Sequence, residues 1–205
     1  SEAQTDNVAV LLRMADVAYM MENYTAMSEV CDKALHLDTS NLQTYLYYAK
    51  ACRGLGEPIR AVAVLSLAIK LREDYYAARL LRGTILLENH LLDDAAQDAD
   101  YLFTHLGPNE DVLLLKARVL KAQEKTKEAE QVYGMVIEVN PFSLDAYRER
   151  SEVRTILGDA AGAAEDEASI KEMGAEVPEP SEGIEQKIKE KMQQMDPYKV
   201  FHNEY

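Results

Sequence analysis

Few side chains in this sequence have the type and spacing that catalysis or metal binding requires. The four histidines are His36, His90, His105 and His202. No two of them stand three or four residues apart, the spacing that would place two metal ligands on one helix face. The two cysteines, Cys31 and Cys52, are too few for a disulfide framework or a cysteine metal site. We therefore expect no catalytic residue, no metal and no cofactor, and we expect that the protein is not an enzyme.

The charge of the chain argues against nucleic acid as a partner. The net charge is −14 over 205 residues, whereas a nucleic-acid surface needs a basic face. No run of 18 apolar residues occurs, so we expect no membrane span in this chain. The sequence begins at Ser1 and not at a methionine, which suggests a processed or excised piece. We expect a cytoplasmic protein, or a cell-envelope or periplasmic one if a signal segment was removed before Ser1.

The elements that would position any site recur every 34 residues. Two Leu-Gly-acid sequences, at 55–57 and 157–159, lie 102 residues apart, which is three times 34. A repeat started at Val8 fits five times without insertions. The predicted repeats are 8–41, 42–75, 76–109, 110–143 and 144–177, and the repeat domain covers 8–174. We number positions 1 to 34 within each repeat.

Small or apolar residues hold fixed positions in all five repeats. Position 8 is occupied by Ala15, Ala49, Gly83, Ala117 and Ser151. Position 20 is occupied by Met27, Ala61, Ala95, Ala129 and Ala163. Position 27 is occupied by Ala34, Ala68, Leu102, Val136 and Ile170. Small side chains at regular points allow two helices to approach closely, so each repeat is predicted to be a pair of packed helices.

Turn residues separate the predicted helices. Gly56 and Gly158 suit the left-handed residue just past a helix end, and Pro58 suits the first turn of the next helix. Pro141 ends one helix before the fifth repeat begins. The predicted helices are 8–21, 25–37, 42–55, 58–71, 76–88, 92–106, 110–123, 127–139, 144–157 and 160–173.

The repeat pattern stops after Gly174. Residues 175–182 are predicted to form a linker, residues 183–196 a helix and residues 197–205 a tail. In the predicted helix Ile184, Ile188, Met192 and Met195 fall on one face. Two interpretations remain open: the helix caps the last repeat, or it docks on a second copy of the chain and makes a homodimer through 183–205. The tail is either a frayed end or a peptide that lies on the array itself.

Over Val8 to Gly174 the chain resembles the tetratricopeptide repeat (TPR) proteins. The resemblance rests on the constant period of 34 residues, the small positions above and Pro141 at position 32. Large residues at position 4 add to it: Leu11, Tyr45, Leu113 and Tyr147. Arg79 departs from this pattern at position 4 of the third repeat, and Met27 replaces alanine at position 20 of the first. The resemblance implies an all-α TPR α-solenoid, a right-handed superhelix of antiparallel helix pairs, here with a C-terminal capping helix.

In TPR proteins the first helix of each pair lines a concave groove. The positions carried over by this resemblance give four leucines and a set of polar residues. The candidate peptide-binding residues are Leu12, Leu46, Lys50, Arg53, Leu80, Thr84, Leu114, Arg118 and Lys121. Apolar anchors beside cations suit an acidic or amphipathic peptide. Two alternatives stay open: the cations are simply solvated, and the leucines partly pack between neighbouring helices.

We therefore expect a non-catalytic protein–protein interaction scaffold that binds a peptide or partner protein in its concave groove. The alternative is a structural assembly subunit, or a fragment of a larger TPR array, that oligomerises through its C-terminal helix and tail. The resemblance also places Cys31 and Cys52 at core positions near each other. We expect buried thiols there, or a disulfide if the compartment is oxidising.

Overall fold

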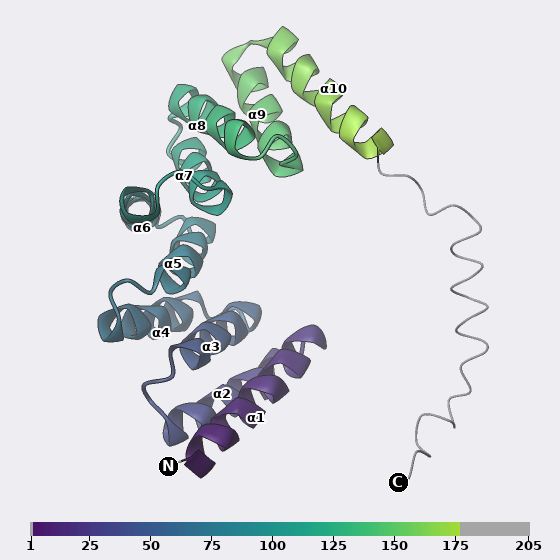
Figure 1. Ribbon diagram of the computed structural model, residues 1–205. Helices are drawn as coiled ribbons and strands as arrows, with labels where there is room; N and C mark the ends of the chain where they lie inside the picture. The colour runs from purple at the N-terminus through teal and green to yellow at the C-terminus, as the bar shows by residue number, and fades with distance from the viewer. Residues whose placement is uncertain (1, 177–205) are drawn as a thin grey trace, which may run out of the picture.

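The computed structural model describes residues 2–176, and these residues form an array of paired helices (Figure 1). We call the first helix of each repeat helix A and the second helix B. The A helices are α1 (Glu2–Met20), α3 (Leu42–Gly54), α5 (Tyr76–Glu88), α7 (Glu110–Ala122) and α9 (Leu144–Leu157). The B helices are α2 (Tyr24–Leu37), α4 (Pro58–Leu71), α6 (Leu92–Leu106), α8 (Thr126–Val139) and α10 (Ala160–Glu176).

Each helix packs against the next one along the chain, so the array grows by stacking. Helix A of one repeat also contacts helix A of the next, as α1 does with α3 and α3 with α5. Figure 1 shows the result as a curved solenoid, with the A helices toward the hollow side and the B helices toward the outside. The all-α solenoid expected from the sequence is confirmed, and no strand is present among residues 2–176.

The turn between helix A and helix B is the same in every repeat. Position 15 has a left-handed backbone in all five, with φ between 54° and 80°. The residues there are Glu22, Gly56, His90, Glu124 and Gly158. The predicted left-handed conformation of Gly56 and Gly158 is confirmed. In the other three repeats an ordinary side chain tolerates the same conformation because the packed helices on either side fix the turn.

The small positions form the contact between paired helices. Ala15, Ala49 and Ala117 at position 8 are fully buried, and so are Ala61, Ala95 and Ala129 at position 20. A Cβ added at Gly83, also at position 8, would lie 3.3 Å from Asp98 Cβ on the paired helix α6 and 2.9 Å from Leu115 Cδ2 on α7 of the next repeat. Larger residues at this position would push the helices apart, which explains the restriction to small side chains.

Repeats three and five bury an ion pair between their two helices. Arg82 Nη2 lies 2.6 Å from Asp98 Oδ1, and Arg150 Nη2 lies 2.6 Å from Asp166 Oδ1. Both pairs join positions 7 and 23, and the two aspartates are 2% and 1% exposed. Both arginines bind with two nitrogens, a geometry that compensates the cost of burying the charges.

Arg79 interrupts the apolar residues of position 4, and the structure explains how the fold accommodates it. Its guanidinium lies 3.6 Å from the centre of the Tyr101 ring and 3.5 Å from Asp98 Oδ1. The buried carboxylate and the aromatic ring therefore take the place of an apolar neighbour.

Helix ends agree with the prediction to within three residues, except at the start of the array. There α1 begins at Glu2, six residues before the predicted start at Val8, because residues 2–7 contain no proline or glycine that would stop a helix. At the other end α10 passes through Gly174 to Glu176, two residues into the predicted linker. The predicted helix 183–196 and tail 197–205 lie outside the described residues. Among residues 2–176 no helix is long and apolar enough to cross a bilayer.

Candidate functional site

The four predicted groove leucines differ in what they present to a ligand. Leu12 and Leu114 are only 9% and 8% exposed, because they pack between helices. Leu46 and Leu80 are half-buried against the cores of their repeats, and part of each side chain stays accessible. Apolar contact with a ligand is therefore available near the second and third repeats, and Thr84 lies one helical turn after Leu80.

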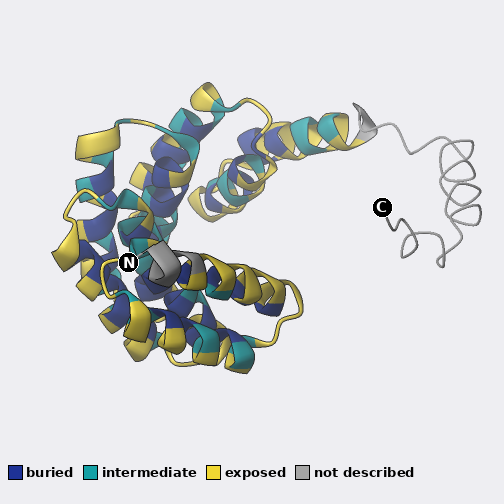
Figure 2. Cartoon of the chain, turned by 60° about the horizontal axis from the view of Figure 1, so that its bottom comes forward, coloured by how far each residue is buried: buried dark blue, intermediate teal, exposed yellow. Residues whose placement is uncertain are grey.

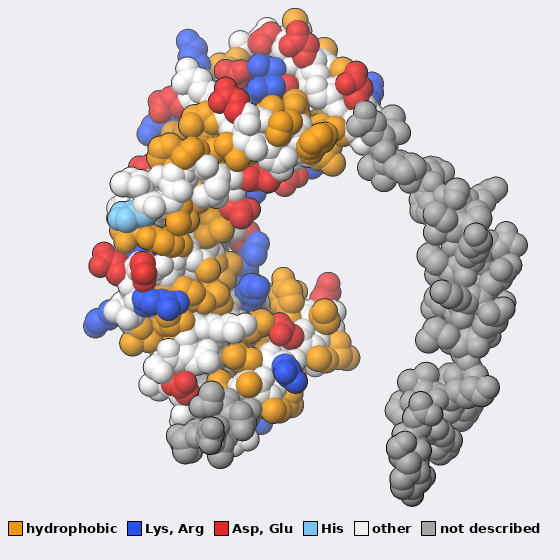
Figure 3. All heavy atoms as spheres, viewed as in Figure 1, with side chains coloured by type: hydrophobic (Ala, Val, Ile, Leu, Met, Phe, Trp, Pro, Cys, Tyr) orange, Lys and Arg blue, Asp and Glu red, His pale blue; other side chains and the backbone are white. Residues whose placement is uncertain are grey.

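Three of the predicted groove cations are bridged to acids of the following repeat. Arg53 Nε donates to Glu88 at 2.9 Å, and Lys121 Nζ lies 2.5 Å from Glu152. Arg118 bonds Glu149 at 2.6 Å. These bridges join helix A of one repeat to helix A of the next, and Figure 3 shows acidic and basic side chains gathered along this inner edge. In the fourth and fifth repeats the charges of Arg118 and Lys121 are thus compensated by acids of the protein.

The Arg118 bridge extends into the core. Tyr133 is fully buried, and its hydroxyl donates to Glu149 Oε2 at 2.7 Å. Burial, followed by this bond to a carboxylate, raises the pKa of Tyr133 well above its ordinary value. Bonding to Glu149 also raises the pKa of Arg118. The tyrosine stays protonated and the arginine stays charged, so this group serves to lock the fourth repeat to the fifth.

Lys50 has a different environment from the other groove cations. Its Nζ lies 5.3 Å from the centre of the Tyr19 ring and 5.7 Å from that of Tyr47. Within the described part of the chain, no carboxylate lies within ion-pair distance of it. The nearby Asp16 accepts a hydrogen bond from the Tyr47 hydroxyl. Burial and the bond to Asp16 raise the pKa of Tyr47, so it remains a donor at neutral pH.

The spacing along the sequence accounts for one of these bridges, Arg118–Glu149. Position 9 of one repeat contacts position 6 of the next, 31 residues later, as in Asp16–Tyr47 and Arg118–Glu149. For Lys50 the residue 31 positions later is Leu81. An apolar residue therefore stands where Asp16 and Arg118 find a bonding partner in the next repeat, as Leu115 also does for Thr84. This leaves the Lys50 ammonium with two aromatic rings.

The residues that could do chemistry lie apart. His36 Nδ1 lies 2.7 Å from the Asp32 carbonyl oxygen, His105 stacks on Tyr101, and His90 sits in a turn. His202 lies outside the described residues. Among residues 2–176 no three His, Cys, Asp or Glu side chains are arranged to hold a metal ion.

Cys31 and Cys52 are both fully buried and unpaired by a disulfide, in the core of the first two repeats. Burial, with a contribution from Cys52, raises the pKa of the Cys31 thiol to about 12. Both cysteines belong to the same hydrophobic cluster.

Comparison with known proteins identifies the fold. No family model and no curated protein matches the sequence. Several solved structures do match the fold. MamA (residues 41 to the end) from Desulfovibrio magneticus RS-1 is 14% identical, covers 85% of this chain and 98% of its own, and gives a TM-score of 0.75. YrrB, described as a TPR protein with an unusual peptide-binding site, is 15% identical over 88% of this chain and 90% of its own, with a TM-score of 0.62.

A tetratricopeptide repeat protein from Parabacteroides merdae is 19% identical over 78% of this chain and 62% of its own, with a TM-score of 0.70. The chain has the tetratricopeptide repeat fold. At these identities the likeness concerns the fold alone, and it does not indicate which side chains of this chain contact a ligand.

Proposed function

We propose that this protein is a non-catalytic scaffold whose groove binds an acidic, amphipathic segment of a partner protein. The observation that carries the proposal is the Lys50 ammonium, held between Tyr19 and Tyr47 without a carboxylate partner among the described residues. YrrB shares the fold and is described as having a peptide-binding site, which supports a peptide as the class of ligand.

Lys50 is suited to take a carboxylate from a ligand. Its two aromatic neighbours orient the ammonium but leave its hydrogen-bond donors available. A carboxylate from Asp or Glu that enters this position would gain a charge-assisted bond without first displacing an existing bridge. Arg53, Arg118 and Lys121 differ because each would have to exchange an acid of the protein for an acid of the ligand, with little net gain.

The apolar part of the ligand would lie beside this cation. Leu46 is on the same helix as Lys50, and Leu80 with Thr84 follows on the next A helix. A segment with one acidic residue next to two or three large apolar ones would contact all of these residues. A helix or an extended strand can both present this pattern, and grooves recognise each of them through such anchors.

Charge reversal at Lys50 tests the proposal. Peptides are first selected on the wild-type protein from a random library, and their affinities are then measured for Lys50→Glu by fluorescence anisotropy. We expect enriched peptides to carry Asp or Glu beside apolar residues. We expect Lys50→Glu to weaken them by about tenfold or more, equivalent to about 1.4 kcal/mol.

Lys70→Glu is the matched control. Lys70 is exposed on α4, a B helix, so the same charge change there alters the net charge of the protein but not the groove. The proposal is wrong if the selected peptides bind Lys50→Glu as tightly as Lys70→Glu. It is also wrong if selection yields no acidic peptides.

A second candidate function is an assembly subunit that self-associates through residues 183–205. The favouring observation is the polar end of the last repeat, where Glu167 and Lys171 are exposed. An apolar helix that followed would find little surface to cover there. The molar mass of the full chain in light scattering, at several concentrations, tests this candidate, since a monomer at all concentrations excludes self-association.

A further inference from the structure

The first repeat exposes the apolar surface that every later repeat buries. At position 3 Val10 is 56% exposed, and at position 10 Val17 is 55% exposed. The position-3 equivalents are Thr44, Ala78, Val112 and Ala146, and the position-10 equivalents are Ala51, Ile85, Val119 and Val153. All eight are at most 2% exposed. Helix B of the preceding repeat covers these positions from the second repeat onward, whereas α1 follows no described helix.

The opposite end of the array is built differently. Position 24 faces the following repeat. It is occupied by the buried Leu65 in the second repeat and the buried Tyr133 in the fourth, but by the exposed Glu167 in the last. Position 28 is Ile69 in the second repeat and becomes Lys171 in the last. The last helix thus carries its own polar surface. The first helix keeps the apolar surface of an internal repeat, so the two ends cannot stack head to tail.

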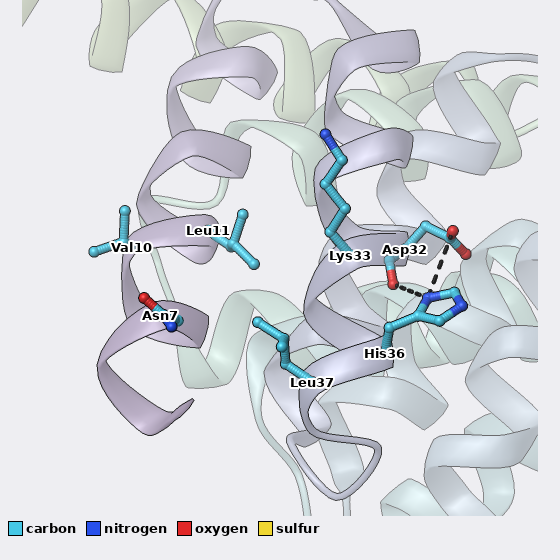
Figure 4. A pocket seen from close by; sticks show the side chains of 7 residues that line it. All are labelled: Asn7, Val10, Leu11, Asp32, Lys33, His36 and Leu37. Carbon is cyan, nitrogen blue, oxygen red and sulfur yellow. Dashed lines mark hydrogen bonds and ion pairs between the residues drawn. The ribbon is translucent and has the colours of Figure 1, made fainter. Parts of the chain in front are cut away.

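The exposed face of α1 is hollowed rather than flat. A cavity of about 410 Å³ lies between α1 and α2 and is lined by Met14, Val17, Met21 and Val30 among others. A second cavity of about 550 Å³ adjoins it at Val10 and is lined by Leu11 and Leu37, with Asp32, Lys33 and His36 at one side (Figure 4). Figure 2 shows exposed residues along α1. We call the surface made by Val10, Met14, Val17 and Met21 the α1 face.

We propose that the α1 face is the docking site for residues 183–196 of this chain. The inference deepens the second candidate function, and it involves neither Lys50 nor the concave groove. It names the surface that receives the C-terminal segment.

The two apolar patterns have the same length. Along α1 and the residue that follows it, the apolar residues of the α1 face run from Val10 to Met21 at spacings of four, three and four. In the C-terminal segment the apolar residues run from Ile184 to Met195 at spacings of four, four and three. On a helix each pattern would extend about 16 Å along one face. Two such stripes can interdigitate along their full length, as ridges of packed helices do.

Three further points favour this occupant over an unrelated protein. The last repeat offers Glu167 and Lys171 to whatever follows it, so the apolar stripe of 183–196 has no equivalent surface there. The segment belongs to the same chain, so one copy of it is present for every α1 face. Both stripes contain two methionines, whose flexible side chains adapt readily to a facing apolar surface.

Cysteine cross-linking in the full-length protein tests the contact. Val17→Cys is combined with Met192→Cys, and disulfide formation under mild oxidation is followed on non-reducing gels. The native Cys31 and Cys52 are buried and do not interfere. The control pairs Met192→Cys with Ile59→Cys, because Ile59 is 85% exposed on α4, away from the α1 face. Circular dichroism checks that each variant is folded.

We expect at least tenfold faster cross-linking for the Val17 pair than for the Ile59 pair. A cross-link within one chain or between two chains supports the contact, and the between-chain product also supports assembly. Equal rates for the two pairs overturn the proposal. So does cross-linking of Val17→Cys alone at the rate of the pair, because this would show two α1 faces meeting each other.

Discussion

The left-handed turn at position 15 predicts that replacing its glycine by alanine lowers the stability of the protein. Gly158 has φ 80° and ψ 10°, and a Cβ added there would meet no heavy atom within 4 Å. The cost of Gly158→Ala is therefore entirely a backbone cost. A left-handed conformation costs an alanine about 1–2 kcal/mol. Alanine also lowers the conformational entropy of the unfolded chain, which stabilises the folded state by about 0.4–1 kcal/mol. The net destabilisation is therefore about 1 kcal/mol.

Gly134→Ala is the matched control, because it makes the same chemical change in a helix. Gly134 lies inside α8, and a Cβ there would lie 3.7 Å from Arg150 Nη1, an ordinary contact. Alanine is favoured over glycine in a helix interior by about 0.5–1 kcal/mol. We therefore expect Gly134→Ala to stabilise the protein.

Urea unfolding followed by far-ultraviolet circular dichroism measures both effects. The midpoint should fall for Gly158→Ala and rise for Gly134→Ala, with an unchanged dependence on urea concentration. A midpoint for Gly158→Ala equal to or above that of the parent would refute the reasoning. Such a result would mean that the turn relaxes out of the left-handed region and that the flanking helices do not fix it.

Two further predictions concern buried groups. Asp98→Ala leaves Arg82 and Arg79 without their buried counter-ion and should lower the free energy of unfolding by about 3–5 kcal/mol. The control, Asp93→Ala on the exposed part of the same helix, should lower it by less than about 0.5 kcal/mol. Urea midpoints measure both changes, and equal midpoints for the two variants would contradict the prediction. Because the Cys31 pKa is raised from 9.0 to about 12, the unfolded thiol ionises first, so stability is complete below pH 9 and is lost as the pH rises toward 12. Between pH 8 and 10.5 the wild type should lose about 2 kcal/mol more than Cys31→Ala, and equal losses would place the thiol in contact with water.

The repeat period predicted most of the fold, because helix-pair packing leaves a signature at every position 8 and position 20. A side chain such as Ala129 is small for a reason that recurs 34 residues away in either direction. Residue type was a weaker guide to the turns. Glu22, His90 and Glu124 adopt the same left-handed conformation as the glycines, and only their place in the repeat indicates it.

The candidate site was less predictable, because position within a repeat does not determine exposure. Leu12 and Leu46 share position 5, yet Leu12 is buried and Leu46 keeps part of its surface exposed. The bridges of Arg53, Arg118 and Lys121 could not be inferred from their own helices. Their partners come from the next repeat, and they meet only after the repeats have stacked.

This stacking also determines where the groove can discriminate between ligands. A bridge between two A helices stabilises the array, but it removes both charges from recognition, since a ligand must break it to use either one. The fourth and fifth repeats use their inner charges in this way, with Tyr133 adding a buried bond to Glu149. Leu81 prevents the same arrangement at Lys50. If the groove binds an acidic peptide, selectivity should therefore come from the first three repeats, and the last two should serve chiefly as a rigid support.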